Sequence, residues 1–215
     1  MDANITKQSS SSTSTLIGLL RHGITRWNEE KRIQGSMDSP LSEQGKKRTE
    51  AWAEQLLKEN WERIIASDLG RVQETVAILN RKLNLPVFFD PRLREMHWGE
   101  WEGLPVNDVF KSQASLVEKM VNDGWEFRPP GGESRKEALQ RAKAGIADAA
   151  IKWPGQKILV VCHLGIIKCL ICDSVGSSFL PGETPKIFKD GLHLLQFENS
   201  SFTCLKINIP LSASS

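Results

Sequence analysis

The chain has 215 residues, of which 40% are hydrophobic and 25% are charged, a composition typical of a globular protein with one sizeable core. Its 28 basic and 26 acidic residues nearly balance, so the formal net charge is only +2. This balance argues against a dominant nucleic-acid-binding or membrane-binding surface. Any site for an anion therefore has to be local.

The first residues, MDANITKQSSSSTST, are rich in Ser and Thr and contain no apolar run like that of a signal peptide. We expect disordered tails at residues 1–14 and 211–215, and a single domain over residues 15–210. No apolar stretch is long enough to cross a bilayer, and the expected location is cytoplasmic.

Short apolar runs rich in β-branched or aromatic residues recur along the chain. They predict strands over residues 15–20, 63–68, 85–90 and 157–163. The stretch GLHLLQFENSSFTCLKINI near the C-terminal end predicts two more strands, joined by a polar turn.

Helical periodicity lies between these runs. It predicts helices, the first capped by Ser42, over residues 43–60, 71–83, 106–123, 134–153 and 165–175. Strands that alternate with helices indicate an α/β fold, a three-layer αβα sandwich with a mostly parallel central sheet. Residues 99–132, which carry several Trp and Gly residues, are expected to form a loop-rich segment that covers part of the molecule.

Four cysteines, Cys162, Cys169, Cys172 and Cys204, include a C-x-x-C pair close to His163, which is compatible with a metal site or a redox pair. The surrounding sequence LGIIKCLICDSV is apolar with helical periodicity, and free cysteine often packs as a small buried hydrophobe. Packing is the favoured interpretation, and zinc or redox chemistry is the alternative.

Charged and ionisable residues stand where the predicted strands end. Arg21 and His22 follow the first strand, Arg71 the second, Glu95 the third and His163 the fourth. Ligands of open α/β sheets collect at the carboxyl ends of strands, so these side chains are expected in one pocket. Such a set suits a phosphoryl group, because Arg matches phosphate oxygens, His can attack phosphorus and a carboxylic acid can protonate the departing oxygen.

Six motifs carry a resemblance to a known family. RHGITRWN, IQGSMDSPLSEQG, SDLGRVQET, LREMHWGEWEG, PGGES and VVCHLG occur here in the order found in the histidine phosphatase superfamily. From about residue 16 to about residue 170, the chain resembles its phosphoglycerate mutase-like branch (branch 1). The resemblance implies the fold of that branch.

The resemblance also implies roles for individual residues. His22 matches the nucleophile that becomes a phosphohistidine, and Arg21 and Arg71 match the arginines that bind the transferring phosphoryl group. His163 matches a second histidine, which donates to phosphoryl oxygens. Glu95 matches the acid that protonates the leaving alkoxide and then accepts a proton from the hydrolytic water.

Further residues of the motifs are implied to bind the substrate. Asn28 and Gln34 match side chains that line the phosphate pocket, and the backbone N–H of Leu164 can donate to phosphate. Gly23 and Gly35 allow the backbone to approach the ligand or to turn sharply.

Three positions depart from the family pattern. Cys162 stands where Ser or Thr usually precedes the second histidine, and Leu164 replaces a small residue, which narrows the space near the leaving group. Ile24 stands where mutases of the family carry Glu or a similar polar residue. This difference favours a phosphatase over a mutase.

Two histidines and two tryptophans have less support for a role in the site. His97 is expected at the surface or half-buried, and His193 is expected to be structural. Trp98 and Trp101 are expected to pack under the covering segment, with a wall for the organic part of the substrate as the alternative.

These residues predict a metal-independent phosphomonoesterase that hydrolyses a small phosphorylated substrate without a cofactor, since the arginines supply the charge that a metal would bring. The alternatives are a cofactor-dependent phosphoglycerate mutase and a catalytically weak phosphoester-binding module. Chain length and the motifs HWGEWEG and PGGES favour the phosphatase. Sugar phosphates, a cobalamin-precursor phosphate and phosphoproteins are all candidate substrates, and the oligomeric state is open.

Overall fold

The structure, a computed structural model, describes residues 13–211. The tails expected at residues 1–14 and 211–215 lie almost entirely outside the described residues. Of these two segments the structure describes Thr13 and Ser14, which are exposed, and Leu211, which is buried in an apolar cluster. The packed chain therefore reaches one residue past the expected boundary at residue 210.

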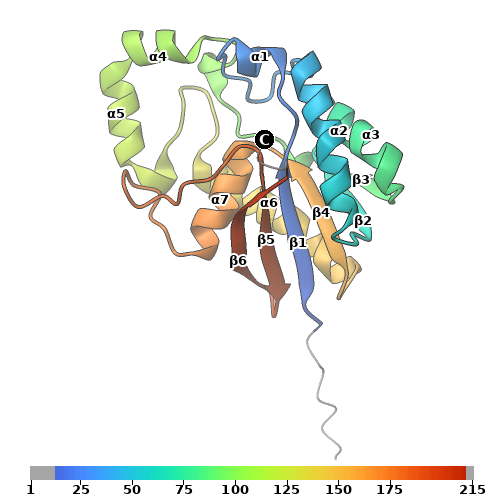
Figure 1. Ribbon diagram of the computed structural model, residues 1–215. Coiled ribbons are helices and arrows are strands. Elements are labelled where there is room, and N and C mark those ends of the chain that lie inside the picture. The colour runs from blue at the N-terminus through green and yellow to red at the C-terminus, as the bar shows by residue number, and fades with distance from the viewer. Residues whose placement is uncertain (1–12, 212–215) are drawn as a thin grey trace, which may run out of the picture.

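Within the described residues, six strands form one sheet in the order β3-β2-β4-β1-β5-β6 (Figure 1). The first four strands in the chain run parallel, whereas β5 is antiparallel to β1, and β6 to β5. The sheet is therefore mostly parallel, as predicted. The strands are β1 Thr15–Arg21, β2 Arg63–Ala66, β3 Val87–Phe89, β4 Lys157–Cys162, β5 Gly191–Glu198 and β6 Ser201–Pro210.

The predicted helices are present, with one correction: the helix expected over 106–123 is two helices, because the backbone leaves helical geometry at Gln113 (φ −130°, ψ 31°). Ser42 caps α2 as predicted. The helices are α1 Arg26–Glu29, α2 Glu43–Leu57, α3 Gly70–Leu83, α4 Val106–Ser112, α5 Ala114–Asn122, α6 Arg135–Lys152 and α7 Leu164–Ser174, with short 3₁₀ turns at Pro91–Leu93, Gly99–Trp101 and Gly124–Glu126. Across residues 13–211, none of them has the length and apolar character that a membrane span requires.

The sheet has an apolar cluster on each face. In β4, Ile158 and Val160 belong to the cluster under α6 and α7, whereas Leu159 and Val161 belong to the cluster under α2 and α3. Successive strand residues point to opposite faces, so an unbroken apolar run places side chains in both clusters. Helices cover both faces as a result, and the three-layer αβα prediction is confirmed (Figure 1).

Strand register brings the chemistry-bearing segments together at one edge of the sheet. Arg21 is paired with Cys162 in the ladder, and the N–H of His22 donates to the Cys162 carbonyl at 3.0 Å. On the other side of β4, the N–H of Ser67 donates to the Val161 carbonyl at 3.1 Å. The segments that leave β1, β2 and β4 are therefore adjacent, as parallel strands require.

Candidate active site

A cavity of about 300 Å³ lies at this edge of the sheet. The residues that the sequence assigned to the site line it, with the exceptions of His163 and Gly23. The predicted residues that line it are Arg21, His22, Asn28, Gln34, Gly35, Arg71, Glu95 and Leu164.

The His22 ring is held in one orientation. Its Nδ1 donates to the Gly23 carbonyl at 2.7 Å, because that oxygen can only accept, and Nε2 has no hydrogen-bond partner within residues 13–211. Burial holds the pKa of His22 well below its ordinary value, and the positive charges of Arg21 and Arg71 lower it further. His22 is therefore a neutral imidazole, with an unshared electron pair on Nε2.

Arg71 is fully buried, and its guanidinium forms four hydrogen bonds. Nη1 donates to the Met37 carbonyl at 2.8 Å and to Asp38 Oδ1 at 3.0 Å. Nη2 donates to the Gly35 carbonyl at 2.7 Å and to His163 Nδ1 at 3.2 Å. The guanidinium thereby connects residues 35–38 to the beginning of α3 and to the end of β4.

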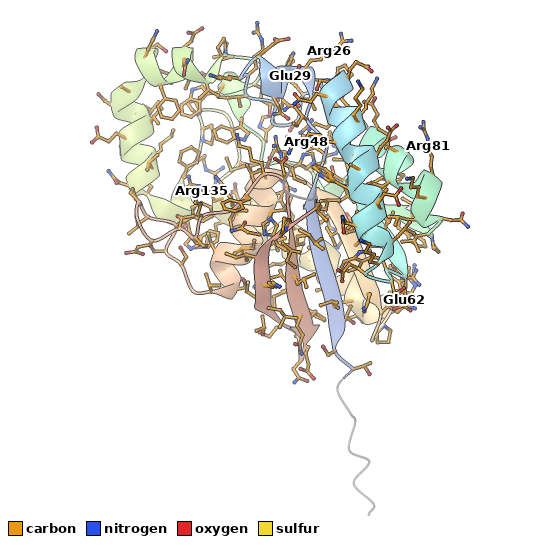
Figure 2. All side chains as sticks on the ribbon, viewed as in Figure 1. Arg26, Glu29, Arg48, Glu62, Arg81 and Arg135 are labelled. Atoms are coloured by element: carbon orange, nitrogen blue, oxygen red, sulfur yellow. The ribbon has the colours of Figure 1, made fainter. Side chains whose placement is uncertain are left out.

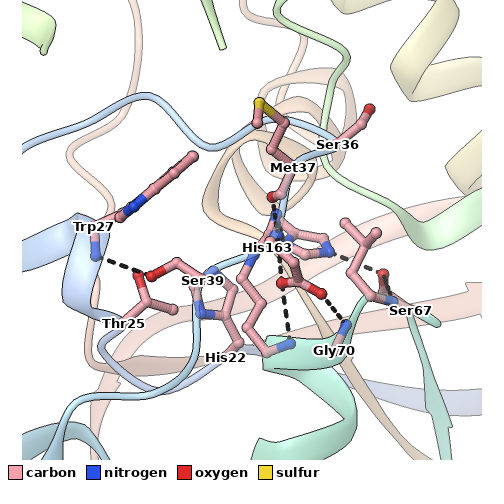
Figure 3. Close-up of polar contacts among 12 residues, drawn as sticks. His22, Thr25, Trp27, Ser36, Met37, Ser39, Ser67, Gly70 and His163 are labelled. Atoms are coloured by element: carbon pink, nitrogen blue, oxygen red, sulfur yellow. Dashed lines mark hydrogen bonds and ion pairs between the residues drawn. The ribbon is translucent and has the colours of Figure 1, made fainter. Parts of the chain in front are cut away.

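His163 lies behind Arg71 and is fully buried. Its Nδ1 accepts from Arg71, so Nε2 carries the proton and donates to Ser67 Oγ at 2.9 Å (Figure 3). The ring centroid is 5.2 Å from that of His22. Burial, and after it the charge of Arg71, lowers the pKa of His163 well below its ordinary value. His163 therefore holds Arg71 in position. Because both of its ring nitrogens are already bonded, the hydrogen bond to Arg71 or the one to Ser67 would have to break before His163 could donate to a ligand.

Asn28 orients Arg21, since its Oδ1 accepts from Arg21 Nη2 at 3.0 Å and from the Thr25 N–H at 3.2 Å. Thr25 and Asn28 form a capping box at α1, which explains why a four-residue helix follows β1. Burial lowers the pKa of the Arg21 guanidinium, an effect that nearby Glu95 opposes.

Three buried polar atoms beside the cavity have no hydrogen-bond partner among the described residues: Arg21 Nε, Arg71 Nε and Gln34 Oε1. Buried polar atoms in folded proteins are normally satisfied, and an unsatisfied donor is costly. Two unsatisfied guanidinium donors beside the cavity favour an acceptor-rich, anionic ligand.

Glu95 is held against the first turn of α7. Its Oε2 accepts from the Gly165 N–H at 3.2 Å, and its Oε1 accepts from the Met96 N–H at 2.9 Å. A Cβ at position 165 would lie 2.3 Å from Oε1, so glycine is needed for this approach. Sequence reasoning missed Arg141, whose Nη1 donates to the Arg94 carbonyl at 2.7 Å and whose Nη2 donates to the Glu95 carbonyl at 3.0 Å.

The departures from the family pattern have different structural consequences. Leu164 lines the cavity, whereas Cys162 is buried in the apolar cluster under α6 and α7, and burial raises the pKa of its thiol. Cys169 and Cys172 pack in the same cluster. Ile24 does not line the cavity, so its side chain does not distinguish a phosphatase from a mutase. Its carbonyl accepts from the Ser42 N–H at 2.9 Å.

The structure also places the two histidines and two tryptophans to which no motif gave a role. His97 is exposed, and His193 is buried, with Nδ1 accepting from the Asn208 N–H at 3.1 Å. Trp98 lines the cavity, while Trp101 is buried and donates from Nε1 to Gln113. Trp98 is therefore part of the cavity wall, whereas Trp101 packs as expected.

The sequence assigned no role to the other lining residues. Val106 comes from the covering segment and Phe179 from the segment after α7, and three of the residues are cations. These unpredicted residues are Arg32, Ile33, Met96, Val106, Arg135, Gly165, Lys168, Cys169 and Phe179. Lys168 lies within the helix predicted over 165–175, one turn after Leu164, and this spacing was the one available signal.

A family model, the histidine phosphatase superfamily (branch 1), matches residues 17–210. The α/β fold and the cavity at its sheet edge agree with this match, and the chain belongs to the histidine phosphatase superfamily. The match extends about 40 residues past the resemblance seen in the motifs.

Individual relatives agree with this assignment. The chain is 37% identical over 158 residues to the probable phosphoglycerate mutase GpmB of Enterobacter sp. (strain 638), covering 74% of each chain. Among solved structures, it resembles Bacillus stearothermophilus YhfR (TM-score 0.80, 26% identity, 93% of this chain and 98% of that one). It also resembles a mycobacterial glucosyl-3-phosphoglycerate phosphatase in complex with VO3 (TM-score 0.79, 28% identity, 90% and 98%).

We predict that acid weakens the fold through its buried histidines. Folding lowers the pKa of His22 and His163, and lowers that of His193 to about 4, mainly by burial. Below about pH 6.5 the unfolded chain therefore binds protons that the folded chain does not, so stability falls as the pH decreases. Melting temperatures measured between pH 7.5 and 5 should fall, and His193→Asn, which retains an acceptor for Asn208, should reduce the slope.

The matched control is the exposed His97, replaced by the same residue in His97→Asn. It should leave the pH slope of the melting temperature as in the wild type. Equal slopes for the wild type and His193→Asn would contradict the assignment of this pH dependence to His193.

Proposed function

We propose that the protein is a metal-independent phosphomonoesterase that works through a phosphohistidine on His22. The observation that carries the proposal is the state of that ring: neutral, oriented by Gly23, and with Nε2 free of partners within residues 13–211. Nucleophilic histidine needs this protonation state. The substrate we propose is a small phosphorylated molecule, and the cytoplasm, where such metabolites are made, is the proposed location.

In the first step, His22 Nε2 attacks phosphorus and the P–O bond to the organic group breaks. Glu95 gives its proton to the departing oxygen, and Arg21 and Arg71 stabilise the charge on the transferring group. Glu95, now ionised, next accepts a proton from water as that water attacks the phosphohistidine. Inorganic phosphate is released, His22 regains its lone pair, and Glu95 is protonated again.

The remaining predicted residues have supporting roles in this scheme. Gln34, Gly35 and the N–H of Leu164 line the phosphoryl end of the cavity, and Asn28 orients Arg21. His163 acts as a positioning residue by holding Arg71. The guanidinium groups supply the positive charge that a metal supplies in other phosphatases, which is why we propose metal independence.

Trapping the intermediate tests the proposal. Acid-quenched mass mapping after brief exposure to a labelled phosphomonoester should find the label on His22, and the label should be released as inorganic phosphate. His22→Ala should take up no label, and EDTA should leave the wild-type rate unchanged. A wild type that neither takes up label nor releases phosphate from a broad panel of phosphoesters, yet binds them, would instead be a phosphoester-binding module.

Leaving-group dependence tests Glu95. We expect Glu95→Gln to slow hydrolysis of alkyl phosphates by about 100-fold or more, the ordinary contribution of a general acid. The loss on 4-nitrophenyl phosphate should be much smaller, because nitrophenolate departs with little protonation. Steady-state kcat/KM values for both substrates provide the measurement, and equal losses would remove Glu95 from this role.

The 37% identity to a probable phosphoglycerate mutase supports a second candidate, a mutase that returns the phosphoryl group to another substrate. Incubation with 3-phosphoglycerate and a trace of bisphosphoglycerate separates the two. We expect inorganic phosphate to accumulate at least as fast as 2-phosphoglycerate. Fast isomerisation with little phosphate release would establish the mutase.

A further inference from the structure

The proposed reaction leaves one of the six motifs, PGGES at residues 130–134, without a role. Ser134 of this motif caps α6, and Figure 2 labels Arg135, the first residue of that helix. Glu133, the acidic residue of the motif, forms an ion pair with Arg141 of α6, and the two side chains are only 18% and 24% exposed. A largely buried ion pair adds little net stability by itself, so the other groups that these two side chains bind indicate what the pair does.

Arg141 uses all five N–H donors of its guanidinium. Nε donates to Glu133 Oε1 and Nη2 donates to Glu133 Oε2, both at 2.7 Å. Nη1 donates to the carbonyls of Arg92 and Arg94, both at 2.7 Å, and Nη2 donates to the Glu95 carbonyl at 3.0 Å. Three of these hydrogen bonds therefore hold the main chain from which the Glu95 side chain extends.

Glu133 binds the next part of the same segment. Its backbone N–H donates to the His97 carbonyl at 2.9 Å, and its Oε2 accepts from the His97 N–H at 3.3 Å. A Cβ at position 132 would lie 2.5 Å from the His97 carbonyl oxygen, so Gly132 permits this close approach. The motif and Arg141 together hold the main chain on both sides of Glu95.

The segment that they hold has no regular structure of its own. Residues 94–98 form neither a helix nor a strand, so their backbone groups need partners from elsewhere in the chain. The N–H groups of Met96 and Gly165 orient the Glu95 carboxylate, whereas Arg141 fixes the carbonyls before and at Glu95. The distance from this carboxylate to a ligand in the cavity therefore depends on the ion pair.

We propose that Arg141 and Glu133 are positioning residues for the general acid, which place the Glu95 carboxyl group within reach of the departing oxygen. The inference rests on the proposed function, in which Glu95 protonates that oxygen. Neither Arg141 nor Glu133 lines the cavity, so both act through Glu95 and not on the substrate. A displacement of about 1 Å is sufficient to slow a reaction strongly, so loss of this support impairs proton donation.

Leaving-group dependence distinguishes positioning from general damage to the fold. Arg141→Met should lower kcat/KM for benzyl phosphate, whose leaving group is an alkoxide, by about tenfold, a smaller loss than that of Glu95→Gln. The loss on 4-nitrophenyl phosphate should be less than about threefold, because nitrophenolate departs with little protonation. A merely structural role would reduce the fraction of active molecules and would lower both activities equally.

A double variant provides a second measurement. Glu95→Gln leaves no carboxylic acid to position, so adding Arg141→Met should lower kcat/KM for benzyl phosphate by less than about twofold further. Losses that multiply in full would show that Arg141 acts independently of Glu95 and would overturn the inference.

Glu133→Gln retains an oxygen that can accept from the His97 N–H but removes the charge that holds Arg141, so it should show the same selective loss at a smaller size. If Arg141→Met does not fold, Arg141→Lys replaces it with the same expected selectivity, because an ammonium keeps the charge but lacks the planar fork of donors. Lys143→Met is the matched control, since it removes another cation of α6, one that pairs with Asp173 at 2.7 Å and lies outside the cavity. It should leave the ratio of the two kcat/KM values as in the wild type.

Wild-type activity separates failure of this inference from failure of the proposed function. Phosphate release through a labelled His22, together with equal losses on both substrates or no loss in Arg141→Met, would retain the phosphatase and overturn the positioning role. A wild type that releases no phosphate from any phosphomonoester would reject the proposed function and the inference with it.

Discussion

The site depends on one buried charge. Arg71 is only 1% exposed, and burying a guanidinium is tolerable only when it is paired and hydrogen-bonded. Asp38 supplies the pairing, and its carboxylate also accepts from the Gly70 and Arg71 N–H groups at the beginning of α3. The bonds to Gly35 and His163 complete the network. A loop, a helix and a strand end are thus held together by the electrostatic requirement of one side chain.

The same burial determines the chemistry available to His22. Low-dielectric surroundings and two neighbouring guanidinium groups both disfavour a charged imidazole. The Gly23 carbonyl selects the tautomer, so the free nitrogen is Nε2. A phosphoryl dianion entering the cavity would meet a neutral imidazole and cationic side chains already held in place, whereas in water the solvent dipoles have to reorient around it.

Parts of the fold away from the sheet edge build the other end of the cavity. The cover, residues 99–132, contributes Val106 to the wall and Phe127 to the stack that fixes Arg135. Phe179, from the segment after α7, completes that stack. The sheet edge and the covering segment therefore contribute different parts of the cavity wall.

Patterns in the sequence are sufficient to predict the layered fold and most of the residues at the sheet edge. Apolar runs specify strands, and polar residues that follow parallel strands must meet at one edge, so His22 and Glu95 were predictable. Only the tertiary structure shows the helix break at Gln113, the position of His163 behind Arg71, and the presence of Arg135 and Lys168 in one cavity. Hydrogen bonds and uncompensated charges depend on which segments meet in space, and residues 33 or more positions apart in the chain, such as Arg135 and Lys168, carry no periodic signal of that meeting.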